Sequence, residues 1–74
     1  MTTRDQLLAE ARLLAFDLTV ERTERHGRPT IEVRYTQAGM PILKTVTLMP
    51  NDTMTEDQAE VWLLGRAIDE LRAA

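Results

Sequence analysis

Few side chains in this sequence have the chemistry that catalysis needs. His26 is the one histidine, and its imidazole is the group that ordinarily titrates near neutral pH. It stands in a turn-like segment, without a cysteine or serine beside it that it could activate. Two pairs of adjacent carboxylates, Glu56-Asp57 and Asp69-Glu70, fall in a helical pattern, where neighbours point about 100° apart and do not converge as an acid–base pair would. The sequence therefore predicts no catalytic residue.

Metal and cofactor sites are also not expected. The chain has no cysteine and a single histidine, which leaves a zinc site without its usual ligands. It also has no glycine-rich phosphate loop and no H-E-x-x-H motif. We therefore expect a protein that is not an enzyme, with no metal and no cofactor.

The length and composition set further limits. A chain of 74 residues without disulfides can form one domain, residues 1–74, with a small core. The lack of cysteine is typical of a cytoplasmic protein. No apolar run approaches the roughly 18 residues of a membrane span, so no membrane association is expected.

Charge is distributed unevenly along the chain, which has a net charge of −3. Residues 18–51 hold five basic residues against three glutamates, whereas residues 52–74 hold six acidic residues against two arginines. An acidic surface can occupy a basic groove on another protein. The sequence therefore predicts protein-binding contacts at the carboxylates of the last segment, namely Glu56, Asp57, Glu60, Asp69 and Glu70.

Hydrophobic periodicity predicts a helix near the start of the chain, over residues 4–16. Thr3 and Gln6 have the spacing of a capping box. The apolar residues that follow recur at helical intervals and are Leu7, Leu8, Ala11, Leu14 and Ala15. The stripe needs another element to cover it.

From Leu18 the period changes to two, which predicts strands. His26-Gly27 is a tight-turn sequence, and a second turn is expected within residues 37–40, with a loop of two or four residues. These turns give a register that places apolar residues on one face: Val20 with Val33, Leu18 with Tyr35, Arg22 with Ile31, Tyr35 with Ile42, Val33 with Lys44, and Ile31 with Val46. Lys44, the one charge among the apolar residues of its strand face, is expected to snorkel towards an edge.

A second helix is expected over residues 56–71, after a capping box at Thr55 and Gln58. Its predicted apolar stripe consists of Val61, Leu64, Ile68 and Leu71. Gly65 interrupts the helix at a cost of roughly 1 kcal/mol relative to alanine, which indicates close approach of another element. The predicted fold class is α+β, in the order α-β-β-β-α, a three-stranded antiparallel meander with both helices packed on one face.

Three apolar residues stand where the pattern leaves them exposed. Leu43 and Met49 fall on the face of the sheet that the helices leave open, where alternation calls for polar residues. Trp62 lies about 100° around its helix from Val61, so it either flanks the core or anchors an interface. Leu43, Met49 and Trp62 are therefore candidate interface residues.

The element order is also that of double-stranded-RNA-binding domains, and a basic hairpin with Arg22, Arg25 and Arg28 favours that comparison. That family carries lysines at the start of its last helix, whereas this chain has Glu56 and Asp57 there. Nucleic acid is therefore not the expected partner, and a weak RNA-binding domain stays as a minor alternative.

In its small size, arginine-rich composition and acidic last helix, the whole chain resembles the small inhibitors that phages encode against bacterial defence systems, anti-CRISPR proteins among them. The resemblance implies a non-enzymatic, cytoplasmic, protein-binding module that acts as a stoichiometric inhibitor of a defence complex. A homodimeric structural or accessory protein of a phage or bacterium is the main alternative, with the open sheet face or an edge strand as its interface.

Overall fold

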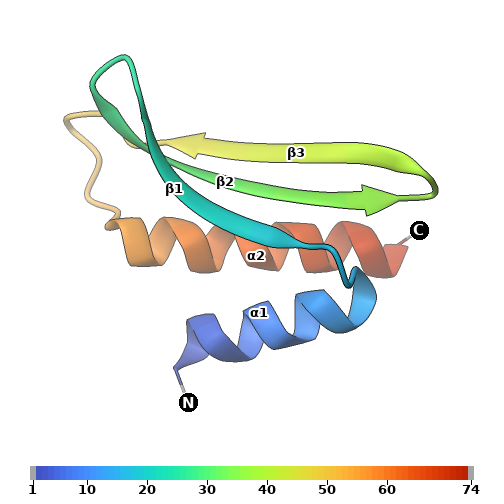
Figure 1. The fold of residues 1–74 in the computed structure, drawn as a ribbon. Helices are drawn as coiled ribbons and strands as arrows, with labels where there is room; N and C mark the ends of the chain where they lie inside the picture. Colours follow the sequence, from blue (N-terminus) through green and yellow to red (C-terminus); the bar gives the residue numbers. More distant parts are fainter. Residues whose placement is uncertain (1, 74) are drawn as a thin grey trace.

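The computed structural model describes residues 2–73 and has the predicted element order. Helix α1 (Thr3–Leu14) is followed by strands β1 (Thr19–Arg25), β2 (Arg28–Gln37) and β3 (Met40–Thr47), and then by helix α2 (Glu56–Ala73). The strands pair antiparallel in the order β1-β2-β3, and both helices lie on the same side of the sheet (Figure 1). The predicted α+β meander is confirmed.

Two tight turns set the register of the sheet. His26 and Gly27 have φ of 54° and 73°, and Ala38 and Gly39 have φ of 52° and 77°. Two consecutive left-handed residues form the hairpin turn whose twist matches that of the strands it joins. The second loop is therefore the two-residue form. Five of the expected pairs are observed: Val20 with Val33, Arg22 with Ile31, Tyr35 with Ile42, Val33 with Lys44, and Ile31 with Val46. The expected pair of Leu18 with Tyr35 is not formed, because β1 begins one residue later, at Thr19.

The bounds of α1 differ from those expected. The Oγ1 atom of Thr2 accepts a hydrogen bond from the backbone N–H of Asp5 at 3.2 Å, so Thr2 is the N-cap and the predicted capping box at Thr3 is wrong. The two adjacent threonines have the same capping chemistry, and the sequence pattern did not distinguish them. The helix ends at Leu14, whereas the sequence predicted an end near Phe16.

Helix α2 lies between the sheet and α1 (Figure 1). Because it is contacted from two sides, its buried face is wider than one stripe and includes Ala59, Glu60, Leu63, Leu64, Ala67 and Ile68. Val61 and Leu71, which the sequence placed in the stripe, are half-buried instead. Neither helix within residues 2–73 combines the length and apolarity that crossing a membrane requires.

Gly65 does not mark a close approach, so that prediction is wrong. A Cβ atom built at Gly65 meets no other atom within 4 Å apart from its chain neighbours and the nearby backbone of its own helix. We therefore expect Gly65→Ala to raise the free energy of unfolding by about 1 kcal/mol through better helix propensity, measured by urea denaturation. Gly39→Ala is the matched control and should destabilise, because Gly39 has φ of +77°. A less stable Gly65→Ala variant would contradict this assignment.

Candidate functional site

The carboxylate of Glu60 lies inside the fold. Its side chain is 2% exposed, and it joins three elements. Arg4 of α1 donates from Nε to Oε1 at 2.8 Å, and Arg22 of β1 donates from Nε and Nη2 to Oε2 at 3.1 and 2.7 Å. A buried carboxylate cannot offer its charge to another molecule. The expectation that Glu60 belongs to an exposed acidic surface is therefore corrected.

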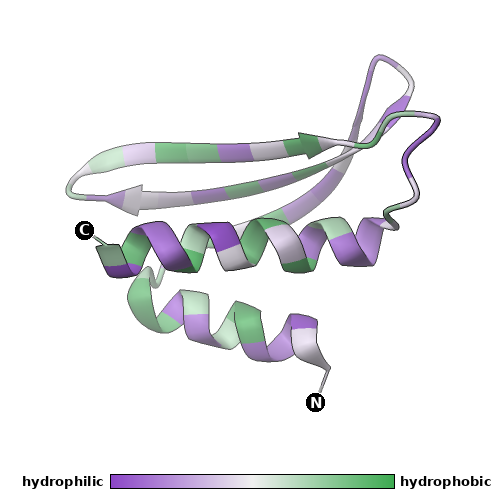
Figure 2. Cartoon of the chain, turned by 180° about the vertical axis from the view of Figure 1, so that it is seen from behind, coloured by the Kyte–Doolittle hydropathy of each residue, from purple (hydrophilic) through white to green (hydrophobic). Residues whose placement is uncertain are grey.

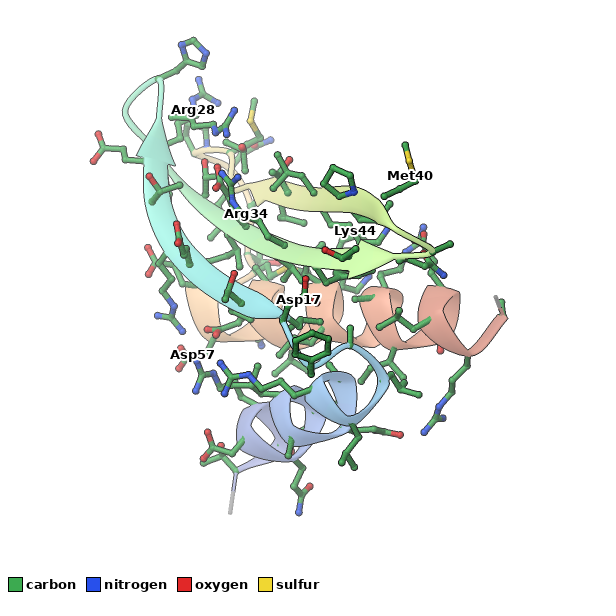
Figure 3. All side chains as sticks on the ribbon, turned by 45° about the vertical axis from the view of Figure 1, so that its right-hand side comes forward. Asp17, Arg28, Arg34, Met40, Lys44 and Asp57 are labelled. Carbon is green, nitrogen blue, oxygen red and sulfur yellow. The ribbon has the colours of Figure 1, made fainter. Side chains whose placement is uncertain are left out.

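Glu56 and Asp57, at the start of α2, contact the same Arg22 side chain that binds Glu60. Arg22 Nη1 donates to Glu56 Oε2 at 3.3 Å, and Arg22 also forms an ion pair with Asp57. Asp57 is the most exposed member of the cluster (Figure 3). The guanidinium of Arg22 thus lies among three carboxylates. Its hydrogen bonds to two of them, Asp57 and Glu60, raise its pKa above the ordinary arginine value.

The far end of α2 is neutralised in the same way. Lys44 of β3 faces the helix side of the sheet and forms an ion pair with Glu70 of α2. Asp69 is exposed and forms no ion pair with the described residues. Four of the five carboxylates predicted to bind a partner therefore face arginine or lysine within the fold, and the surface of α2 is less acidic than its sequence.

The basic hairpin is also partly neutralised. Glu32 lies on the face of β2 that points away from the helices, and its side chain is only 4% exposed. Arg25 donates to Glu32 Oε1 at 2.6 and 3.1 Å, and Arg34 donates to Oε2 at 2.9 Å. The hydrogen bonds from Arg25, which have the larger effect, and from Arg34 lower the pKa of the Glu32 carboxyl. The two arginines thus cover a carboxylate, which weakens the case for phosphate binding.

The three candidate apolar interface residues are all half-exposed, but they do not form one patch. Leu43 is on the outer face of β3, and Trp62 is on α2 beside Lys44 and Thr45 of the same strand. Met49 follows β3, where its Sδ atom lies 2.9 Å from Nη1 of Arg28. Leu43 and Trp62 therefore flank β3 from the two sides of the sheet.

Trp62 stands between two shallow hollows with mainly apolar walls. One hollow, of about 360 Å³, is lined by Val46, Leu48, Asp52, Thr53, Met54 and Trp62. The other, of about 470 Å³, is lined by Thr3, Asp57, Gln58, Val61 and Trp62. The indole is 48% exposed, and the guanidinium of Arg66 lies 5.6 Å from the ring centroid. We call the surface formed by Val46, Leu48, Met54 and Trp62 the Trp62 face.

A second exposed apolar group lies at the end of α1 and was missed by sequence reasoning. Leu13 is 89% exposed and Phe16 is 93% exposed. A signal was present in the sequence, because residues 13–16 are all apolar and a single helical stripe cannot bury four consecutive residues. The two side chains do not line any of the hollows beside Trp62.

His26 and the clustering of acidic side chains are the remaining features with a bearing on chemistry. His26 is exposed at the tip of the first hairpin. Among residues 2–73, no three histidine, aspartate or glutamate side chains gather so as to hold a metal ion. Comparison of the chain with models of protein families, with curated proteins and with solved structures gives no match.

Proposed function

We propose that this protein is a non-enzymatic protein-binding module of the cytoplasm, and that the Trp62 face is its contact surface. The observation that carries the proposal is a half-exposed tryptophan between two apolar hollows. Tryptophan is enriched among the residues that dominate binding energy at protein interfaces. The mainly apolar walls of the two hollows extend the apolar contact that the indole offers to a partner.

The charges of the fold support an apolar contact over an acidic one. Glu60 is buried, and Glu56, Asp57 and Glu70 each lie against a basic side chain of the same molecule. A partner that approached α2 would meet carboxylates whose charge is already offset. The anti-CRISPR-type inhibitors that the sequence resembles are one class of protein-binding module. A protein of that class would here bind through the Trp62 face and not through the carboxylates of α2.

Photo-crosslinking in the protein's native cells tests this proposal. An aromatic crosslinking amino acid replaces Trp62 in one variant and Phe16 in a matched control, because Phe16 is also aromatic and is more exposed. We expect a protein adduct from position 62 and little adduct from position 16. If position 62 gives no adduct, or if adducts form at position 16 alone, the Trp62 face is not the binding surface.

A further inference from the structure

The two outer edges of the sheet differ in how well they are protected. Strand β1 has charged side chains at four of its seven residues, whereas β3 has one charged residue, Lys44, among eight. In Figure 2, much of β3 has the green colour of hydrophobic residues. Charged side chains are a common means by which natural proteins prevent an edge strand from pairing with another chain. No described strand covers either edge, so the edge of β3, which has fewer charged side chains, is the less protected of the two.

One hydrogen bond shows which residues of β3 direct their backbone N–H and C=O groups towards this edge. The N–H of Leu48 donates to the carbonyl oxygen of Pro29 at 2.9 Å, so Leu48 points its backbone towards β2. Backbone direction alternates along an antiparallel strand, which turns the odd-numbered residues of β3 outward. Leu43, Thr45 and Thr47 thus present N–H and C=O groups to the edge. Pro41, which has no N–H, is also odd-numbered and suits an edge strand.

We infer that the partner at the Trp62 face is a second copy of this chain, paired antiparallel along β3 about a two-fold axis at Thr45. The inference rests on the proposed function, because it names the partner for the same surface. This register pairs Leu43 with Thr47 of the partner subunit and uses all three outward N–H groups of each copy. It also sets Lys44 against Val46 of the partner subunit, whereas an axis at Lys44 would place two ammonium groups opposite each other.

The side chains around Thr45 make the surface complementary to itself. Lys44, Thr45, Trp62, Leu63 and Arg66 line one hollow, so the axis passes close to this part of α2. A two-fold axis there brings two α2 helices side by side and antiparallel. Trp62 then faces Arg66 of the partner subunit, which extends to a second copy the cation–π contact already present within one chain. The positive charge of Lys44 is matched by Glu70 of its own chain.

Apolar side chains add to this contact on both sides of the sheet. Leu43 is 49% exposed on the outer face, directly beside the open edge. Trp62 is 48% exposed on the helix side, beside Lys44 and Thr45. Edge pairing therefore buries apolar area above and below the new strand pair.

Charge complementation at Thr45 tests the inference directly. Thr45 is exposed but lies opposite Glu32 within the sheet, so circular dichroism and thermal melting must first verify that Thr45→Lys and Thr45→Glu keep the fold. By light scattering, from low micromolar to near-millimolar concentration, we expect the wild type to reach twice 8.4 kDa. Each variant alone should stay at 8.4 kDa, because like charges meet across the axis, and an equimolar mixture should regain the doubled mass.

A proline pair gives a second, independent measurement. Thr45→Pro removes an outward N–H and should abolish the doubled mass. Glu24→Pro is the matched control: Glu24 is also outward-facing, because Arg25 pairs with Arg28 across the turn, and it lies on the opposite edge. That variant should dimerise like the wild type.

The outcomes separate this inference from the proposed function. A wild type that stays at 8.4 kDa throughout, or a Thr45→Lys variant that dimerises like the wild type, overturns the second copy as partner. If the crosslinker at position 62 then captures a different protein, the proposed function holds and the second copy is rejected. If position 62 captures nothing, both are wrong.

Discussion

Glu60→Gln is expected to lower the free energy of unfolding by about 2 kcal/mol, because it removes the charge that two guanidinium groups share. Breaking a fully buried ion pair costs about 3–5 kcal/mol. The cost here should be smaller, because Arg4 and Arg22 are each about 40% exposed and can regain water. Urea denaturation monitored by circular dichroism measures the change.

Asp69→Asn is the matched control for this prediction. Asp69 lies on the same helix but is exposed and forms no ion pair with the described residues. Its replacement should change stability by less than about 0.5 kcal/mol. If Glu60→Gln is as stable as Asp69→Asn, then Glu60 does not hold α1, β1 and α2 together as the contacts indicate.

Leu64→Ala is expected to destabilise the protein by about 3 kcal/mol, because Leu64 is fully buried where α2 meets its neighbours. Leu71→Ala removes the same atoms from a half-buried position on the same helix and should cost about 1 kcal/mol. The sequence placed both leucines in one apolar stripe. Equal losses of stability in the two variants would contradict the burial that distinguishes them.

The strand register could be predicted from the sequence because local features determine it. The His26-Gly27 turn and the alternation on either side of it allow one register that keeps Val20, Val33 and Tyr35 on the same face. A slip by one residue would turn all three towards water. The second hairpin follows the same logic, with Gly39 as the turn residue.

The role of Glu60 could not be predicted in this way. Its arginine partners lie 56 and 38 residues away in the sequence, and no local spacing links Arg4 or Arg22 to α2. The periodicity of apolar residues also indicates where the centre of a buried helix face lies, but it does not indicate how wide that face is. Two neighbours cover α2, which is why Ala59 and Leu63 are buried while Val61 is not.

The candidate interface was predicted in part. Leu43 and Met49 were named from the break they make in the polar pattern, and Trp62 from its position beside the apolar stripe of its helix; all three are half-exposed. The sequence could not show that Trp62 lies beside the open edge of β3, because that depends on how α2 packs under the sheet. The exposure of Phe16 depends on α1 ending at Leu14, which the periodicity did not indicate.

The fluorescence emission of Trp62 tests the contact surface most directly, because Trp62 is the one tryptophan in the chain. Emission recorded across a dilution series, alongside the mass, reports whether water still reaches the indole as molecules associate. We predict an emission maximum typical of a water-exposed indole at low concentration, and a shift to shorter wavelength over the range in which the mass doubles. A doubled mass with unchanged emission would place the interface elsewhere and would contradict the Trp62 face as the contact surface.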